Sequence, residues 1–179
     1  MAAATPAVTK KFTMLEVRPI LPEHWPVLKD VRLRALADAP GAFGTTLAQA
    51  QAYSDAEWQG RARRFSESPP AAGCLAFVDG VPCGMASAFP SAENTHAAEL
   101  TAFWVAPDSR GQGVADAMAA FAAAWALAQG FAVLEAGVVE DNHRAIGFYK
   151  RVGFVETGHS EPFRGDPSKQ ITGLSMKVS

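Results

Sequence analysis

Residues 105–116 read Val-Ala-Pro-Asp-Ser-Arg-Gly-Gln-Gly-Val-Ala-Asp and separate two contrasting segments. Glu99 to Val105, just before, predicts a β-strand, and Pro107-Asp108-Ser109 predicts a loop that leads into a long alanine-rich helix. Four apolar residues of that helix form one stripe suited to packing on a sheet: Val114, Met118, Phe121 and Trp125. Phe131 to Val139 predicts the next strand, so the stretch lies inside a strand-helix-strand unit.

The rest of the chain predicts a mixed α/β domain. Further strands are expected at Glu16 to Ile20, Cys74 to Val78, Val81 to Phe89, Phe154 to Gly158 and Gln170 to Val178. Further helices are expected at Trp25 to Ala35, Asp55 to Phe65 and Asn142 to Val152. We therefore expect a mixed central sheet of about seven strands flanked by about four helices. A length of 179 residues favours one domain over 14–179, preceded by a flexible extension over 1–13.

Charge and composition exclude several classes of partner. A net charge of −2 leaves no general basic surface, so neither nucleic acid nor an anionic membrane is an expected partner. Between Asp116 and Glu135 lie 18 uncharged residues, the lower limit for a membrane-spanning helix. Nine of them are alanine, and Gln129-Gly130 is a helix-stop signal, so a helix followed by a buried strand is the better interpretation.

The two cysteines are expected to be free thiols. A hairpin turn at Asp79-Gly80 would set Cys83 opposite Ala76 rather than opposite Cys74. The first residues also show no basic leader followed by an apolar signal core, and we therefore expect a cytoplasmic protein.

The turn at 110–113 has the features of an anion site. The first N–H groups of a helix are unpaired and carry partial positive charge, and Arg110 adds a full charge beside Gly111 and Gly113. A dinucleotide fingerprint would need a third glycine where the chain has Asp116, and a P-loop would need Gly-Lys-Ser/Thr. A purely structural tight turn and a nucleotide site remain alternatives.

Two blocks of sequence resemble one family. Arg110-Gly-Gln-Gly-Val-Ala115 resembles the R/Q-x-x-G-x-G/A motif of the GNAT superfamily of N-acetyltransferases, and Val105-Ala-Pro107 resembles the Val-x-Pro that precedes it. Asn142-His-Arg-Ala-Ile-Gly-Phe-Tyr-Lys-Arg-Val-Gly-Phe154 resembles the family's second block, N-x-x-A-x-x-x-Y-x-x-x-G-F. The resemblance covers roughly Glu99 to Thr157. It implies a GNAT-type fold, with the sheet splayed between its fourth and fifth strands, and an acyltransferase that uses acetyl-CoA.

The resemblance also implies a set of cofactor-binding residues. The fourth strand would pair its backbone with the pantetheine arm, and the turn would bind the diphosphate through main-chain amides and one guanidinium. The residues concerned are Phe103, Trp104, Val105, Arg110, Gly111, Gln112, Gly113, Val114, Ala115, Asn142 and Tyr149. Ala115 replaces a commoner glycine, and Asp116 places a carboxylate where many relatives carry a basic residue.

Tyr149 and Glu99 are the candidate catalytic residues. Asn142 and Tyr149 are seven residues apart and share one helix face, and the resemblance implies that Tyr149 protonates the leaving thiolate. A neutral amine is the nucleophile, and Glu99 is the best candidate to accept its proton, with Asp141, Glu140 and His96 as substitutes. A core tyrosine, a plain helix cap and a solvated glutamate are the structural alternatives. No metal spacing and no G-x-S-x-G elbow is present, so we expect neither a metal nor a serine hydrolase.

The acceptor site is expected between 37–53 and the loop at 158–169, with Phe43, Tyr53 and Phe163 as binding residues. The expected acceptor is the primary amine of a small molecule or antibiotic. A protein N-terminus or lysine is the alternative within the enzyme class, and a non-catalytic CoA-binding sensor or partner module is the alternative outside it. The protein is expected to be a monomer or a homodimer.

Overall fold

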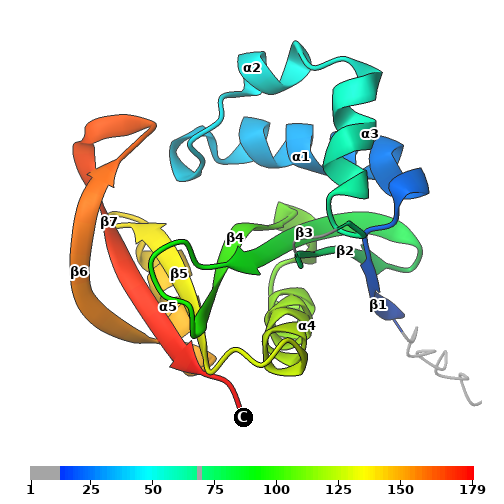
Figure 1. Cartoon of the computed structure of the whole chain (residues 1–179). Helices are drawn as coiled ribbons and strands as arrows, with labels where there is room; N and C mark the ends of the chain where they lie inside the picture. The colour runs from blue at the N-terminus through cyan, green and yellow to red at the C-terminus, as the bar shows by residue number, and fades with distance from the viewer. Residues whose placement is uncertain (1–12, 68–69) are drawn as a thin grey trace, which may run out of the picture.

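A computed structural model of the chain describes residues 13–67 and 70–179, and its centre is one mixed sheet (Figure 1). The strands are β1 (Leu15–Pro19), β2 (Ala72–Val78), β3 (Val81–Pro90), β4 (Ala97–Val105), β5 (Val133–Val139), β6 (Val155–Phe163) and β7 (Asp166–Lys177). Their order is β1-β2-β3-β4-β5-β7-β6, and only the β4–β5 pair is parallel. The extension predicted at 1–13 lies, except for its last residue, outside the described residues.

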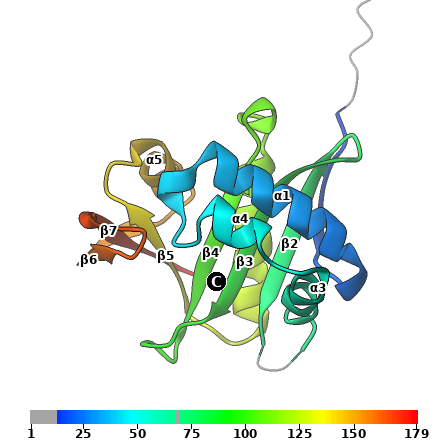
Figure 2. The same cartoon turned by 90° about the horizontal axis from the view of Figure 1, so that it is seen from above.

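Helices cover both faces of the sheet. The elements α1 (Trp25–Asp38), α2 (Leu47–Gln51) and α3 (Asp55–Arg63) lie over one face, and α4 (Val114–Ala128) lies against the other (Figures 1 and 2). α5 (His143–Arg151) follows β5, and three short 3-10 helices are η1 (Pro22–His24), η2 (Pro40–Ala42) and η3 (Pro107–Ser109). α2 was not expected from the sequence, because its only local signal is the capping box that Thr46 and Gln49 form over five helical residues.

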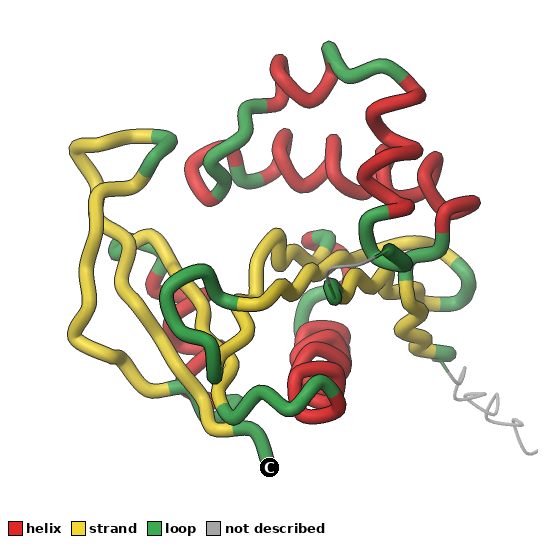
Figure 3. Tube along the Cα trace, in the orientation of Figure 1, coloured by secondary structure: helices red, strands yellow, loops and turns green. Residues whose placement is uncertain are grey.

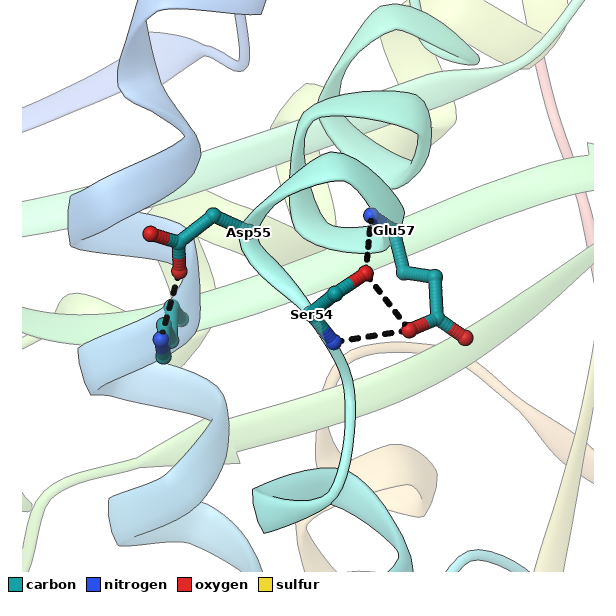
Figure 4. Close-up of polar contacts among 4 residues, drawn as sticks. Ser54, Asp55 and Glu57 are labelled. Atoms are coloured by element: carbon teal, nitrogen blue, oxygen red, sulfur yellow. Dashed lines mark hydrogen bonds and ion pairs between the residues drawn. The ribbon is translucent and has the colours of Figure 1, made fainter.

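Local contacts hold the α1–α3 layer together. Ser54 caps α3 by accepting from the Glu57 amide at 3.3 Å, while the Glu57 carboxylate accepts from the Ser54 amide at 2.7 Å (Figure 4). The Lys29 ammonium of α1 donates to the Asp55 carboxylate at 2.9 Å. Below them, Leu36 and Trp58 are buried in a cluster separate from the main core.

The sheet opens between β4 and β5, as expected for the GNAT fold. The two strands pair only from Ala97 to Leu100 with Val133 to Ala136, and beyond that point they diverge (Figure 3). Ala102 and Phe103 together oppose one residue of β3, and Ala102 has φ +51°, so a β-bulge turns the second half of β4 away from β5. This opening leaves strand backbone free for a ligand.

Three sequence expectations need correction. The buried face of α4 runs through Val114, Met118, Ala119, Ala122 and Ala126, whereas Phe121 and Trp125 lie half-buried at its edge, because alanine lets the helix approach the sheet closely. The loop predicted at 158–169 is instead a long β6–β7 hairpin; β6 is exposed on both faces, so it lacks an alternating pattern. A bulge in β3, where Cys83 is the extra residue, places Gly84 rather than Cys83 opposite Ala76, and both thiols are free.

Candidate active site

A cleft of about 550 Å³ opens between β4, the turn before α4, and α5. Ten residues predicted to bind cofactor or acceptor line it: Phe43, Phe103, Trp104, Val105, Arg110, Gly111, Gly113, Ala115, Asn142 and Tyr149. A smaller cavity of about 90 Å³ lies at the divergence of β4 and β5, and Phe43, Phe103, Asn142 and Tyr149 line both. The tertiary structure therefore brings the two sequence blocks together around one hollow.

The turn before α4 requires glycine for its backbone conformation. Gly111 has φ +76° and Gly113, the N-cap of α4, has φ +83°, a region that side chains disfavour. A Cβ at Gly111 would meet no atom within 4 Å, so conformation rather than crowding accounts for this glycine. The amides of Val114, Ala115 and Asp116 have no carbonyl partner four residues earlier inside the helix, so these N–H groups are available to an anion.

Arg110 is held in place by two acceptors. Its Nε donates to the Val105 carbonyl at 3.0 Å, and its Nη2 donates to the Asp38 carboxylate at 2.5 Å. The same oxygen of Asp38 accepts from the Trp104 indole at 2.9 Å. Partial burial pushes the pKa of Asp38 up, but the hydrogen bonds from Trp104 and Arg110 and the charges of Arg110 and Arg144 outweigh it, and the pKa is lowered. Asp38 carries no local motif that reveals this role.

The Asp116 carboxylate is paired with a basic side chain at the cleft. Both of its carboxylate oxygens accept from Arg151 of α5, at 2.7 and 3.0 Å, and this hydrogen-bonded pair lowers the pKa of Asp116. Arg151 and the exposed Arg144 line the cleft beside it. The Asp116 carboxylate is thus neutralised at the cleft by a residue of α5 that is 35 positions away in sequence.

Two predicted cofactor residues lie outside the cleft lining. Gln112 donates from its Nε2 to the Asp108 carbonyl at 2.8 Å. The Val114 side chain, at the start of α4, points into the core and is 1% exposed. Only their main-chain groups belong to the turn.

Tyr149 is enclosed by aromatic rings. Its ring lies 5.0 Å from that of Phe154, 5.3 Å from that of Phe148 and 5.9 Å from that of Phe103. Burial raises the pKa of its phenol above the ordinary value, so the hydroxyl is protonated at neutral pH and can donate. Asn142 caps α5 by accepting from the Ala145 amide at 3.2 Å, and its side chain still lines both cavities.

Glu99 lies beside the cavities rather than in their walls. It pairs with Phe89 on one side and with Glu135 on the other. Partial desolvation, together with the charges of Glu135, Glu161 and Glu93, raises the pKa of its carboxyl group. Of the substitute bases, Asp141 is engaged by Lys169 at 2.5 Å.

The structure does not bring the three predicted acceptor residues together in one site. Phe43 lines both cavities, while Tyr53 packs edge-on against Trp58 at 5.6 Å and lies under Arg61. Phe163 is buried at the tip of the β6–β7 hairpin. A Cβ on Gly165 of that tip would lie 3.3 Å from the Phe43 carbonyl, so the hairpin tip touches the segment after α1.

No group of three or more His, Cys, Asp or Glu side chains that could hold a metal occurs within residues 13–67 and 70–179. Over the same residues, no helix is long and apolar enough to cross a membrane.

Comparisons with known proteins all point to acetyltransferases. The model of the acetyltransferase (GNAT) family matches residues 35–154. A peptidyl-lysine N-acetyltransferase, YjaB of Salmonella typhimurium, is 42% identical over 62 residues, or 35% of this chain; the match spans only 39% of that relative's length.

Two solved structures share the architecture. The putative acetyltransferase yncA of Salmonella typhimurium, solved with its cofactor acetyl-CoA, aligns over 93% of this chain and 95% of its own, with a TM-score of 0.75 and 14% identity. Nourseothricin acetyltransferase aligns over 64% of this chain and 69% of its own, with a TM-score of 0.57 and 28% identity.

Proposed function

The chain belongs to the acetyltransferase (GNAT) family of acyltransferases, and we propose that it transfers an acetyl group from acetyl-CoA to the primary amine of a small molecule. The cleft carries this proposal: it joins the anion site before α4 to Tyr149, across the gap where β4 leaves β5. A donor with a diphosphate at one end and a thioester at the other fits that path.

Each part of the cleft has a role in the proposed reaction. The amides at the start of α4, with Arg110 and Arg144, bind the diphosphate. The free backbone of β4 around Trp104 pairs with the pantetheine arm, and Asn142 contacts it from α5. The acetyl-CoA supplies the activated acyl group, and transfer to the amine is direct, without an acyl-enzyme.

Two side chains move the protons. The Tyr149 hydroxyl, which stays protonated because burial raises its pKa, donates a hydrogen bond to the sulfur as the carbon–sulfur bond breaks and so stabilises the departing thiolate. Glu99 accepts the amine proton through water, and its raised pKa makes it a stronger base than an ordinary glutamate. Both groups interact with charge that develops only in the transition state, so they lower the barrier rather than strengthen substrate binding.

The proposed acceptor is a small amine or antibiotic. The likeness to nourseothricin acetyltransferase and the small volume, about 90 Å³, of the cavity that Phe43 lines favour such an acceptor. The YjaB match favours peptidyl-lysine as the second candidate. The two buried free thiols are consistent with a cytoplasmic protein, and a monomer or homodimer suffices because one chain contains the whole cleft.

Calorimetric titration with acetyl-CoA, with NAD and ATP as controls, is the first test. Saturable binding of acetyl-CoA alone is expected; equal binding of NAD or ATP would favour a nucleotide site. A screen of small amines and peptides, read by mass spectrometry, then identifies the acceptor. Acetylated peptides without any acetylated small amine would select the lysine alternative, and binding without any transfer would select a CoA sensor.

A further inference from the structure

We propose that Asp38 is a positioning residue that couples occupancy of the cofactor cleft to the acceptor-side segment 39–46. The inference rests on the proposed function, because it concerns how acetyl-CoA binding reaches the other half of the site. Asp38 itself does not line either cavity.

One carboxylate oxygen of Asp38 joins three elements. Asp38 is the last residue of α1, Trp104 belongs to β4, and Arg110 belongs to the turn before α4. The two donors lie 2.9 and 2.5 Å from the same oxygen, and they are 66 and 72 residues away in sequence. The side chains of Asp38 and Arg110 are only 27% and 30% exposed, so this pair is better shielded than the other ion pairs of the described residues.

The segment that starts after Asp38 is a shared wall. Ala39, Ala42 and Phe43 line the large cleft, and Ala42 and Phe43 also line the small cavity at the divergence of β4 and β5. The Phe43 carbonyl in turn lies against Gly165 of the β6–β7 hairpin. A displacement of the end of α1 therefore reaches both sides of the acceptor region.

The position of Asp38 at the end of α1 makes the electrostatic stability of its carboxylate depend on Arg110. A carboxylate at the C-terminal end of a helix is disfavoured by the helix dipole, and α1 has no basic residue in its last turn. Arg110, Trp104 and the field of Arg144 offset this cost from outside the helix. A diphosphate in the cleft is a second anion for the same guanidinium groups, so the strength of the Asp38 contact depends on whether the cleft is occupied. Two sites that bias one contact are thermodynamically coupled.

Hydrogen exchange of the full-length chain tests this coupling without an acceptor. The Ala39 and Ala42 amides donate to carbonyls of Ala35 and Ala39, both at 3.0 Å, and report on this segment. Acetyl-CoA should change the exchange rate of 39–46 at least about fivefold in the natural sequence. Asp38→Asn keeps the shape but loses the charge; acetyl-CoA should still bind it, while the change at 39–46 falls to within about twofold.

Two variants complete the experiment. Asp38→Glu restores the charge and should recover part of the response. Asp30→Asn removes another carboxylate of α1, in an exposed pair with Arg34, and should leave the response intact. An undiminished response in Asp38→Asn would overturn the proposal, and so would a natural protein that binds acetyl-CoA with no change at 39–46. Failure of the natural protein to bind acetyl-CoA at all would instead reject the proposed function and, with it, this coupling.

Discussion

Tyr149 is the side chain on which the proposed chemistry depends most directly. Tyr149→Phe removes one hydroxyl from an aromatic cluster that otherwise keeps its packing. We expect kcat to fall about 100-fold, because a positioned acid contributes on that order, while the Kd for acetyl-CoA stays within about threefold. Steady-state kinetics and calorimetry measure the two quantities.

The matched control is Tyr53→Phe, which removes the chain's other tyrosine hydroxyl at a place outside both cavities. Its activity should stay within about twofold of the natural protein. Equal kcat losses in both variants would show that the effect is not specific to the cleft and would remove the assignment of Tyr149 as the acid.

Glu99 has a consequence for pH dependence. Because its pKa is raised in the folded state, the acidic limb of the rate profile should lie above pH 4.5, with activity lost as the pH falls through that pKa. Glu99→Gln should lower kcat/KM about 100-fold and abolish this limb. A profile for Glu99→Gln that retains both rate and limb would return the role of base to another group.

The raised pKa of Glu99 also determines how the folding stability of the protein changes with pH. A carboxyl group whose pKa is raised on folding holds its proton more tightly in the folded state, so its contribution is present at low pH and is lost as pH rises from the ordinary value, 4.5, through the raised pKa. Glu99→Gln should therefore have a higher Tm than the natural protein at pH 8 and the same Tm near pH 3.5. Thermal unfolding at the two pH values measures it, and a lower Tm at pH 8 would contradict it.

At the level of elements, the start of α4 depends on one left-handed residue. Gly113→Ala places a Cβ at φ +83°, which costs about 1–2 kcal/mol, and Tm should fall by roughly 2–8 °C for a chain of this size. Acetyl-CoA binding should weaken as well, because the amides of the turn shift. Thermal unfolding and calorimetry measure both effects.

A second glycine provides the control. Gly60 lies inside α3, where a Cβ would meet only the Arg63 guanidinium at 4.0 Å. Gly60→Ala should therefore stabilise the protein by about 0.5–1 kcal/mol without changing cofactor binding. A stable, fully active Gly113→Ala variant would show that the turn tolerates a side chain.

Across the whole molecule, the Asp116–Arg151 pair joins α4 to α5, and both residues line the cleft. Arg151→Gln leaves the Asp116 carboxylate unopposed near the diphosphate, so the Kd for acetyl-CoA should rise about fivefold at low salt. The double variant Asp116→Asn/Arg151→Gln removes both charges and should return to within about twofold of the natural Kd. Calorimetry at low salt and at high salt measures this, and the difference should shrink at high salt.

A Kd for the double variant as weak as that of Arg151→Gln alone would contradict this balance. It would mean that Arg151 contacts the cofactor directly rather than neutralising Asp116.

The sequence predicts the mixed sheet from apolar periods along single elements, and the tight turn before α4 from its glycines. The family is predicted from the resemblance of two motif blocks, and the spacing within the second block places Tyr149 and Asn142 on one helix face. The packing of the chain, and no local pattern, brings Asp38 into contact with Arg110 of the cleft and Arg151 into the cleft lining. It also ends the β4–β5 pairing at Leu100 and makes 158–169 part of the β6–β7 hairpin. Contacts between residues 35 to 72 positions apart depend on how helices and strands pack, and no local pattern records that packing.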